Sequence, residues 1–599
     1  MNPIERLKTE WAYLRGIASV LRRVTPIAKN PTHTIRDEVE EWAAEWKDRP
    51  ALLSDRETLS YAELFGHANR WARWAILHGV EKGDRIALLM PNRPEYMAAW
   101  IGISMVGGIT ALLNTNLSGE VLAHSIAAAT PRHVVVDAEL LPLFESAAVH
   151  LGHPAAVWVW GEHPMAYMRI DEALAELSPV RLFGRDRRPL AQSDDCVWIY
   201  TSGTTGLPKA ARLNHWRVQA IMAAFSAATR ATKDDRIYVA QPMYHSAGGI
   251  LAPGIVLSVG GSCVVRDRFS ASRFWPDVVR WDCTMIQYIG ELARWLLATP
   301  PCPEETRHRV RIANGNGLRP DVWEAFRDRF RIPEILEWFA ATEGNVTLFN
   351  FDGRPGSVGR IPWWLAHKMP TRIVRFDRAT GAPARGPDGR CLLAAPDEVG
   401  EAIGEIVVDP AKPGQRFDGY ADRAATEKKI LRDVFRPGDA WFRTGDLMRR
   451  DADGWFYFVD RVGDTFRWKG ENVSTTEVAE VIGVFPGIVV ANVYGIEIPH
   501  HDGRAGMAAL LVDDAFDADA FAAHVVDRLA AFARPQVLRL RGSADMTGTF
   551  KLRKIDLAAE GCDPTRIADP LFLLDADARR WIPLDTAVWT RILGGEIRL

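Results

Sequence analysis

Apolar runs of strand length alternate with apolar positions at helical spacing through much of this chain. Residues 85–90 (RIALLM) precede a helical pattern from Pro94 to Val106, and residues 133–138 (HVVVDA) precede another. Residues 196–200 (CVWIY) run directly into a glycine-rich stretch. Strands that alternate with helices in this way are typical of parallel sheets covered by helices. The pattern therefore predicts an α/β fold with substantial parallel sheet.

The pattern changes after an aromatic strand predicted over residues 455–459. A polar, glycine-containing stretch follows, and TTEVAEVI (475–482) then predicts a helix that opens with a capping signal, Ser474 or Thr475 ahead of the apolar run. Residues 489–496 predict a further strand. We therefore predict a large N-terminal domain of parallel sheets sandwiched by helices over residues 31–459, a hinge over 460–465, and a small mobile α+β domain over 466–599.

Residues 1–30 carry apolar side chains at helical spacing with arginines beside them. The apolar positions are Trp11, Leu14, Ile17, Val20 and Leu21, and the basic ones are Arg15, Arg22 and Arg23. The segment is too short and too charged to span a bilayer, which takes about 20 apolar residues. An amphipathic helix lying in the membrane interface fits the pattern, and so does a helix packed on the protein's own body. Both interpretations stay open.

Composition narrows the class of protein. With 599 residues the chain is long enough for two or more domains, and 47% hydrophobic and 25% charged residues are typical of a soluble globular protein. The net charge of -3 argues against a nucleic-acid partner. The six cysteines form no C-x-x-C pair or metal-ligand cluster, and the first residues lack a secretory signal. We therefore expect a cytoplasmic protein, with peripheral contact at the inner face of the cell membrane and a homodimer both left open.

Residues 200–209 (YTSGTTGLPK) combine the residue types that bind phosphate. Glycines let the backbone approach an anion, hydroxyls donate hydrogen bonds, and a lysine adds positive charge. The candidate residues are Thr201, Ser202, Gly203, Thr204, Thr205, Gly206 and Lys209. The stretch is not a Walker loop, because Pro208 precedes the lysine and Ala210 follows it. Since it follows a predicted buried strand, we expect a phosphate-binding loop rather than a plain turn.

This loop resembles the phosphate loop of the adenylate-forming superfamily, which includes acyl-CoA synthetases, luciferases and peptide-synthetase adenylation domains. Residues 338–343 (WFAATE) are similar to its aromatic-x-x-Thr-Glu motif. The resemblance implies that Phe339 stacks on adenine and that Thr342 contacts the α-phosphate. It also implies that Glu343 helps to hold Mg²⁺, a cation well served by one carboxylate plus waters.

Further nucleotide contacts follow from the same resemblance. Residues 314–318 (NGNGL) occupy the place of the adenine-binding loop, which implies contacts from Gly315 and Asn316, although Asn316 departs from the family's small-residue pattern. Residues 443–446 (RTGD) match the Thr-Gly-Asp motif, in which the Asp446 carboxylate would accept hydrogen bonds from both ribose hydroxyls. Arg461 would be the second ribose or phosphate partner.

The hinge and the C-terminal lysines also resemble this superfamily. Residues 460–465 (DRVGDT) fall on the family's hinge, whose pivot would be Gly463, Asp464 or both. Residues 546–551 (MTGTFK) resemble the motif that bears the catalytic lysine. The resemblance implies that Lys551 is this lysine, with Lys554 as the competing candidate. A cation is needed there because negative charge builds up when a carboxylate attacks the α-phosphorus and pyrophosphate leaves.

Two blocks, residues 463–482 and 547–557, resemble one branch in particular: the fatty acid transport protein group of long- and very-long-chain acyl-CoA synthetases. Tyr244-His245 and the glycine-rich turn after it resemble the segment beside the acyl pocket, which makes His245 a catalytic candidate. Coenzyme A should enter near Gly470. Tunnel wall and ordinary core fit equally well for Val256, Leu257, Trp275, Ile286 and Tyr288.

The resemblance implies an AMP-forming long-chain fatty acid–CoA ligase. Its substrates would be a fatty acid, ATP and coenzyme A, with Mg²⁺ as the cofactor, and the reaction could be coupled to fatty acid uptake. Two alternatives stay open: an adenylation enzyme that passes another carboxylic acid to a carrier protein, and a fatty acid transporter without catalysis. The second lacks a long apolar span in the sequence. A P-loop kinase is excluded by the absent Walker motif.

Overall fold

Two helix-covered sheets form the first half of the protein in the computed structural model. The structure describes residues 3–152, 155–164, 167–202, 207–377, 380–409, 413–469, 471–499, 501, 503–543, 554–597 and 599. One sheet has the strand order β7-β6-β5-β3-β4-β8-β9, with every pair parallel except β8 and β9. Its strands are β3 (Arg85–Leu89), β4 (Ile109–Leu112), β5 (His133–Asp137), β6 (Ala156–Trp160), β7 (Met168–Arg169), β8 (Asp195–Ser202) and β9 (Pro208–Asn214).

The second sheet has the order β15-β14-β13-β12-β10-β11-β1-β2. Its six central strands are parallel, and β2 and β15 add antiparallel edges. The strands are β1 (Pro50–Leu53), β2 (Thr58–Ser60), β10 (Arg236–Val239), β11 (Ser262–Val265), β12 (Met285–Ile289), β13 (Ile312–Asn316), β14 (Ile335–Ala340) and β15 (Thr347–Asn350). The predicted α/β class with parallel sheets is therefore confirmed.

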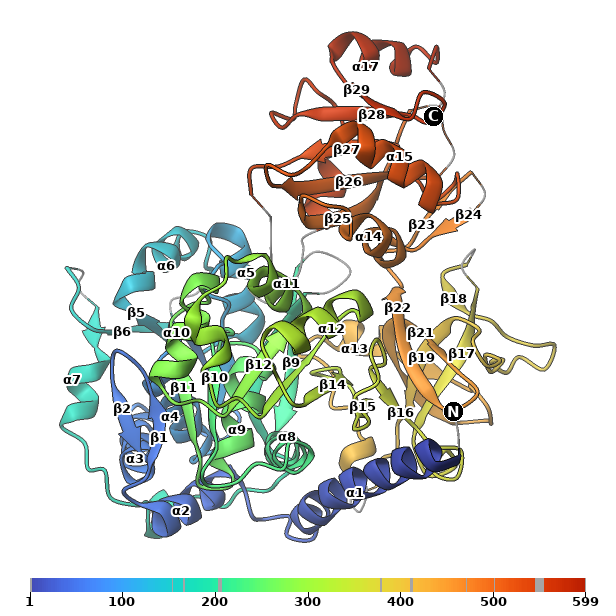
Figure 1. Ribbon diagram of the computed structural model, residues 1–599. Coiled ribbons are helices and arrows are strands. Elements are labelled where there is room, and N and C mark those ends of the chain that lie inside the picture. The colour runs from blue at the N-terminus through green and yellow to red at the C-terminus, as the bar shows by residue number, and fades with distance from the viewer. Residues whose placement is uncertain are drawn as a thin grey trace.

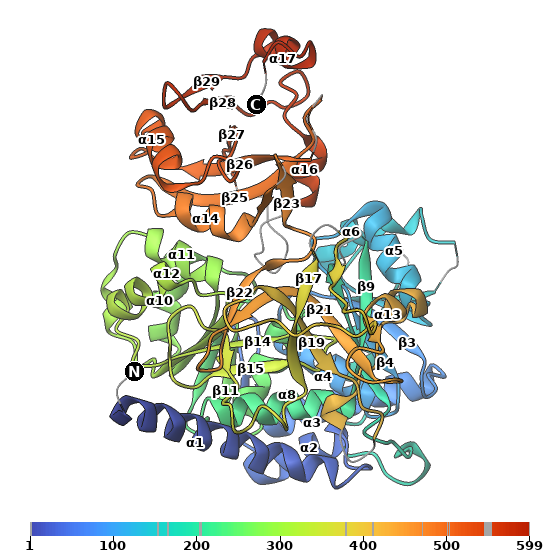
Figure 2. The same ribbon diagram turned by 90° about the vertical axis from the view of Figure 1, so that its right-hand side faces the viewer.

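Helices cover both faces of these sheets (Figures 1 and 2). One core cluster joins inner residues of both sheets to the helices between them, which are α2 (Ile35–Trp46), α3 (Tyr61–Leu77), α4 (Pro94–Ser104), α8 (His215–Ala228) and α9 (Ala252–Leu257). The outer face of the eight-stranded sheet packs on α10 (Ala271–Arg280), α11 (Gly290–Ala298) and α12 (Pro320–Arg329). The outer face of the other sheet packs on α5 (Gly119–Ala129) and α6 (Leu141–Ala148), and α7 (Ile170–Ala175) follows β7.

A third, antiparallel sheet follows, with the order β16-β22-β21-β19-β17-β18 and β20 paired to β21. Its strands are β16 (Gly359–Arg360), β17 (Thr371–Asp377), β18 (Ala382–Pro383), β19 (Gly400–Glu405), β20 (Ile430–Arg432), β21 (Ala440–Arg450) and β22 (Trp455–Arg461), with α13 (Arg423–Lys428) beside them. This sheet was not predicted from the sequence, apart from the aromatic strand at 455–459.

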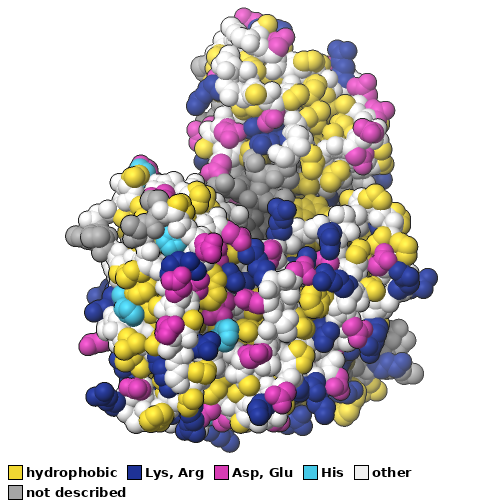
Figure 3. Space-filling model, turned by 90° about the vertical axis from the view of Figure 1, so that its left-hand side faces the viewer, with side chains coloured by type: hydrophobic (Ala, Val, Ile, Leu, Met, Phe, Trp, Pro, Cys, Tyr) yellow, Lys and Arg dark blue, Asp and Glu magenta, His cyan; other side chains and the backbone are white. Residues whose placement is uncertain are grey.

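The chain after β22 builds a separate core. Its elements are β23 (Phe466–Trp468), β24 (Glu471–Val473), α14 (Thr475–Gly483), β25 (Ile488–Ile496), β26 (Ala505–Val512), α15 (Ala518–Arg528), β27 (Val537–Leu540), α16 (Ile555–Glu560), β28 (Leu571–Asp575), β29 (Arg580–Pro583) and α17 (Thr586–Leu593). The predicted helix and strand here are α14 and β25, and Ser474 is the cap: its hydroxyl accepts a 3.2 Å bond from the Glu477 N–H. Figure 3 shows this smaller part standing over the larger one, with a waist between them.

The two parts meet through α14. Asp460, at the end of the large part, is buried and accepts a 2.8 Å bond from the Thr475 N–H at the start of α14. At the other end of α14, Arg319 donates to the carbonyls of Ala479 and Glu480 at 3.4 and 3.2 Å. Cations suit the C-terminus of a helix because its carbonyls carry partial negative charge. These contacts hold the small part in the arrangement seen here.

The N-terminal helix α1 (Pro3–Ala28) lies along the end of the molecule remote from the small part (Figures 1 and 2). Its inner face packs on α8 and buries Tyr13 and Val20. Glu10 accepts a 2.9 Å bond from the Trp364 indole N–H. The interpretation of a helix packed on the body is therefore correct for this inner face. No helix in the described residues is both long and apolar enough to cross a bilayer.

Candidate functional site

Two predicted residues, Thr201 and Glu343, meet at one phenol. Tyr420 donates a 2.7 Å hydrogen bond to Glu343 Oε1, and the Thr201 hydroxyl bonds to the same phenol. Thr201 lies near the end of β8, and Glu343 lies just after β14, so the phenol joins the two large sheets. Burial and the nearby carboxylate raise the pKa of Tyr420 well above its ordinary value, so the phenol stays a donor.

The Thr-Glu motif also touches the histidine segment. The hydroxyls of Thr342 and Ser246 lie 3.0 Å apart, and Ser246 directly follows His245. The His245 ring packs against the Tyr244 ring with centroids 4.5 Å apart. The Tyr244 hydroxyl in turn accepts a 2.9 Å bond from the side chain of Asn116. The predicted acyl-pocket segment therefore lies next to the predicted α-phosphate contact.

A buried arginine supports this loop from behind. Arg217, on α8, donates to the Gly344 carbonyl and, at 3.0 Å, to the Arg416 carbonyl. Burial lowers the pKa of Arg217. Gly344 itself lies on the ring of Phe442 in β21, where an added Cβ would come within 2.4 Å of that ring. Only glycine fits there, and this close approach brings Glu343 toward the third sheet.

The predicted adenine loop is fixed by a buried carboxyl that sequence reasoning missed. Gly315 on β13 is the register partner of Glu337 on β14, two residues before Phe339. Glu337 accepts bonds from the Gly317 and Leu318 N–H groups at 2.5 and 3.2 Å and from the Tyr288 hydroxyl at 2.5 Å.

Burial raises the pKa of Glu337 to about 8. Neutral at pH 7, this carboxyl holds the turn that follows Asn316. The loop and the predicted adenine-stacking residue are therefore anchored on adjacent strands.

The predicted ribose residues form a pair across the third sheet. Asp446 on β21 faces Arg461 on β22 in register, with the Arg461 Nε 3.5 Å from Asp446 Oδ1. The Thr444 hydroxyl accepts a 3.0 Å bond from the Asp446 N–H and donates to the Ala402 carbonyl at 2.7 Å.

The turn before Asp446 is anchored separately. Arg443 binds the buried Glu401 carboxylate with its Nη2 2.7 Å from Oε2. Gly445, at φ +78°, completes the turn and donates its N–H to the same carboxylate at 3.3 Å. The Asp446 carboxylate is thus held at the edge of the large part, next to the waist.

Other predicted residues lie apart from this cluster or outside the described residues. Gly203, Thr204, Thr205, Gly206, Gly470 and Lys551 fall outside them, as does the side chain of Ser202. Lys209 on β9 is the register partner of Thr201. Gly463 and Asp464 lie in the turn after β22. Lys554, the competing lysine, contacts the hinge: its Nζ lies 2.5 Å from Thr475 Oγ1 and 3.3 Å from Asp464 Oδ2.

The five residues that fitted both tunnel and core are buried in two different clusters. Val256 and Leu257 belong to the core between the sheets, while Trp275, Ile286 and Tyr288 belong to the outer face of the eight-stranded sheet. Because the sheet separates the two groups, they do not line one common tunnel.

A metal would have few protein ligands at this site. No cluster of three or more His, Cys, Asp or Glu side chains that could hold a metal occurs among the described residues. A single half-buried carboxylate, Glu343, fits a Mg²⁺ that takes its other ligands from phosphates and water.

Sequence reasoning missed three supporting residues: Tyr420, Glu337 and Arg217. Each acts through a partner far away in the chain, and Tyr420 lies 77 residues from Glu343. The clearest local signal is Glu337, a charged residue inside an otherwise apolar strand (ILEWFA). Such a residue is almost never buried without partners.

Comparison with known proteins finds extensive similarity. Residues 39–409 match the family profile described as AMP-binding enzyme. Long-chain fatty acid transport protein 3 of Homo sapiens is 40% identical over 532 residues, which is 86% of this chain and 76% of that protein. Long-chain fatty acid transport protein 1 of Mus musculus is 40% identical over 547 residues, 90% of this chain and 84% of that protein.

Solved structures share the fold. The anthranilate CoA ligase AuaEII in complex with anthranoyl-AMP superposes with a TM-score of 0.74 at 20% identity, covering 89% of this chain and 98% of that one. ATP-bound MatB from Rhodopseudomonas palustris gives a TM-score of 0.71 at 23% identity, with 88% and 98% covered. A Mycobacterium tuberculosis fatty acyl CoA synthetase gives 0.61 at 21% identity, with 88% and 98% covered.

Proposed function

Because the chain belongs to the AMP-binding enzyme family, we propose that it activates a long- or very-long-chain fatty acid with ATP and transfers the acyl group to coenzyme A. The observation that carries this proposal is the meeting of Thr201, Tyr420 and Glu343, with the Asp446–Arg461 pair on the neighbouring sheet. These groups provide hydroxyl, carboxylate and guanidinium contacts for one nucleotide. Relatives named long-chain fatty acid transport proteins, 40% identical, support the fatty substrate.

The residues divide into nucleotide contacts and reacting-site contacts. Asp446 and Arg461 would hold the ribose, Phe339 the adenine ring, and the hydroxyl-rich loop with Lys209 the phosphates. Thr342 would contact the α-phosphate, and His245 would stand at the mouth of the acyl pocket. The 3.0 Å approach of Thr342 to Ser246 supports this placement, because it brings the α-phosphate contact beside the acyl segment.

The reaction has two balanced steps. First, a carboxylate oxygen attacks the α-phosphorus of ATP, the bond from that phosphorus to the bridging oxygen breaks, and pyrophosphate leaves with the electron pair. Lys551 would stabilise the charge that develops. Second, the sulfur of coenzyme A attacks the acyl carbon, the thiol proton passes to water, and AMP leaves. Mg²⁺, held through Glu343, would neutralise phosphate charge when bound.

A hinge over residues 460–465 would let the small domain present different faces for the two steps. Support comes from its position: the last strand of the large part ends at Arg461, and the separate C-terminal core begins at Phe466. In the present arrangement Lys554 contacts Asp464, so this lysine would act on the hinge rather than on phosphate. Coenzyme A would enter near Gly470.

The test of this function is product analysis with purified protein, ATP, Mg²⁺ and acids from acetate to very long chains. Long-chain acids should give AMP and pyrophosphate and should exceed acetate by orders of magnitude in kcat/KM, since each buried methylene is worth about 0.8 kcal/mol. Omitting coenzyme A should leave a bound acyl-adenylate. Turnover only with a carrier protein would favour the peptide-synthetase-type alternative, and fatty acid binding without any ATP cleavage would favour the non-catalytic transporter.

We further propose that α1 holds the enzyme at the inner face of the cell membrane. Opposite its packed face, α1 exposes an apolar stripe of Leu7, Trp11, Leu14 and Leu21, with Leu7 and Trp11 each 70% exposed. Exposed cations flank this stripe: Arg6, Lys8, Arg15, Arg22 and Lys29. An apolar stripe between cations suits an anionic lipid surface, where each cation contributes about 1 kcal/mol.

Point substitutions test this surface better than deletion of α1, because deletion would also remove the side chains of Tyr13 and Val20, which are buried against the rest of the protein. Leu7→Glu with Trp11→Glu should abolish co-sedimentation with vesicles that contain phosphatidylserine. Val149→Glu, at an 80% exposed apolar position elsewhere, is the matched control and should still bind. Equal binding of both variants would remove α1 as the membrane contact.

A further inference from the structure

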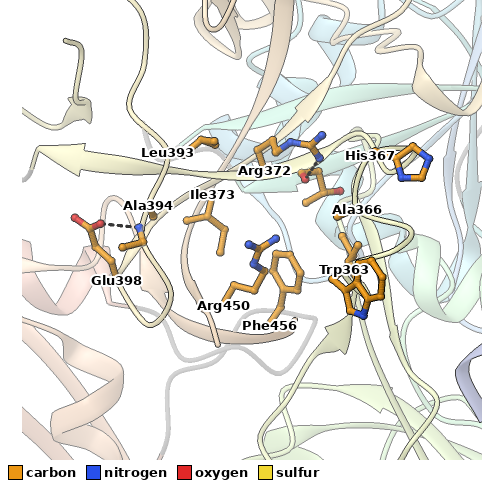
Figure 4. Close-up of a pocket in the computed structure, with 13 residues that line it drawn as sticks. Trp363, Ala366, His367, Arg372, Ile373, Leu393, Ala394, Glu398, Arg450 and Phe456 are labelled. Carbon is orange, nitrogen blue, oxygen red and sulfur yellow. Dashed lines mark hydrogen bonds between the residues drawn. The ribbon is translucent and has the colours of Figure 1, made fainter. Parts of the chain in front are cut away.

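A cavity of about 350 Å³ lies in the third sheet, away from the nucleotide residues (Figure 4). Its walls come from β17, from the ends of β21 and β22, and from the loops before β17 and before β19. The wall is mainly apolar, with Ile361, Ile373, Leu393 and Phe456 among its residues and Trp363 at its edge. The volume lies at the lower end of the range of about 300–1,000 Å³ that small-molecule sites occupy.

Two guanidinium groups line this apolar cavity. Arg450 projects between Ile373 and Phe456 (Figure 4). Among the described residues its side chain has no hydrogen-bond or ion-pair partner, and it is half-buried. Arg372 donates one Nη to the carbonyls of Met369 and Thr371, at 2.7 and 2.8 Å. Burial and the neighbouring Arg450 lower the pKa of Arg372, as expected for two like charges that face one space.

The carboxylates nearby are already engaged. Glu398, which also lines the cavity, binds Arg375 at 2.6 Å and the Ala395 N–H at 2.8 Å. The negative charge of Glu405 raises the pKa of Arg372, but the Glu405 carboxylate forms its ion pair with Arg436, at 2.8 Å. The charge balance of the cavity is therefore positive.

The cavity is separate from the nucleotide residues but lies on the same strands. Asp446 pairs with Arg461 and Arg450 pairs with Phe456 on β21 and β22, and the register shifts by one residue between these two pairs. Four residues along a strand span about 13 Å, at about 3.3 Å each. A ligand in the cavity would therefore not occupy the ribose position.

We propose that this cavity is a second binding site for a fatty carboxylate, distinct from the acyl-activating site. The carboxylate would meet Arg450, with Arg372 beside it, and the first part of the chain would lie against Ile373 and Phe456. An anion with an apolar tail is the ligand that satisfies both features, because an apolar wall alone needs no arginine and a simple anion needs no apolar wall. The choice of a fatty acid as that anion rests on the proposed function.

The experiment measures binding of radiolabelled laurate to the full chain by equilibrium dialysis. The activating site is first saturated with a non-hydrolysable acyl-adenylate analogue. One further laurate per chain should bind, and inorganic phosphate should not displace it. Arg450→Gln should weaken this binding by about 10- to 100-fold, because it removes a charged hydrogen bond. AMP formation by this variant should stay normal.

The neighbouring Arg449→Gln is the matched control. Arg449 pairs with Asp397 at 2.8 Å and lies over the Tyr457 ring, outside the cavity wall. It should bind laurate within about twofold of the wild type. If Arg450→Gln misfolds, Leu393→Glu supplies the test, since Leu393 is 55% exposed and a carboxylate there would repel the ligand.

No laurate beyond the blocked site, or equal binding by Arg450→Gln and the wild type, overturns the proposal. Failure of the proposed function is recognised separately, by the absence of AMP formation. In that case, if laurate binding still depends on Arg450, the proposal of a second site stands without the proposed function.

Discussion

The phenol of Tyr420 offers the sharpest test of how the site is assembled. Tyr420→Phe removes a single hydroxyl. This hydroxyl donates a hydrogen bond to Glu343 Oε1 at 2.7 Å and accepts one from the Thr201 hydroxyl. The ring stays in place, so packing changes little. We expect adenylation to slow and the concentration of Mg²⁺ needed for half-maximal rate to rise, because Glu343 loses the donor that orients it.

The magnitude follows from the surroundings of the carboxylate. A hydrogen bond to a charged group is worth about 1.5–3 kcal/mol. Glu343 is only half-buried, so water can replace part of the lost bond. We therefore take the lower end, which corresponds to about tenfold in rate. Because the pKa of Tyr420 is raised well above its ordinary value, the phenol donates throughout the assay range. The effect should not change between about pH 6 and 9.

The assay is pyrophosphate release with a long-chain acid over a series of Mg²⁺ concentrations. Tyr457→Phe is the matched control, since the Tyr457 hydroxyl, on β22, also donates to a carboxylate, that of Asp451 at 3.2 Å. It should leave the rate unchanged. A double-mutant cycle with Glu343→Gln should give a coupling energy of about 1–1.5 kcal/mol.

Two results would refute the reasoning about Tyr420. One is a Tyr420→Phe rate within about twofold of the wild type in a correctly folded protein, which would match an ordinary surface change. The other is additive loss in the double mutant, which would show that the phenol and Glu343 act independently.

Three other predictions concern separate parts of the site. Burial raises the pKa of Glu337 to about 8 from 4.5, so the folded state keeps a proton that the unfolded state releases, and stability falls as pH rises between these values. Glu337→Gln should abolish that fall in thermal melts from pH 5 to 8.5. Lys551→Ala should stop acyl-adenylate formation but still convert supplied acyl-adenylate and coenzyme A to thioester, whereas Lys554→Ala should spare the first step. Asp446→Asn should raise the KM for ATP, measured at saturating fatty acid.

The parallel-sheet part of the fold could be predicted because its elements carry strong local patterns. The helix at 475–482 was predicted almost to its ends, since Ser474 gives a clear cap. The helix from Pro94 was predicted to Val106 but ends at Ser104, because Gly107 at φ +86° closes a turn there. The antiparallel third sheet was missed apart from one strand, since its register shifts interrupt the alternation of buried and exposed positions, as along β21.

The site could be predicted only as far as motifs stand together in the sequence. Thr342 and Glu343 belong to one motif, but their partners Ser246 and Tyr420 come from distant loops that only the fold brings near. The N-terminal helix shows the same limit. Helical spacing cannot say which apolar face packs inward, and α1 has one face of each kind: Tyr13 is buried and Trp11 is exposed.

The most direct measurement of the central claim follows the carboxylate oxygen. A fatty acid labelled with oxygen-18 in its carboxylate is turned over with ATP, Mg²⁺ and coenzyme A, and the products are analysed by mass spectrometry. An acyl-adenylate pathway predicts AMP that carries one labelled oxygen, since the attacking oxygen stays on the α-phosphorus when the thioester forms. Unlabelled AMP, or ADP with the label in phosphate, would contradict the account.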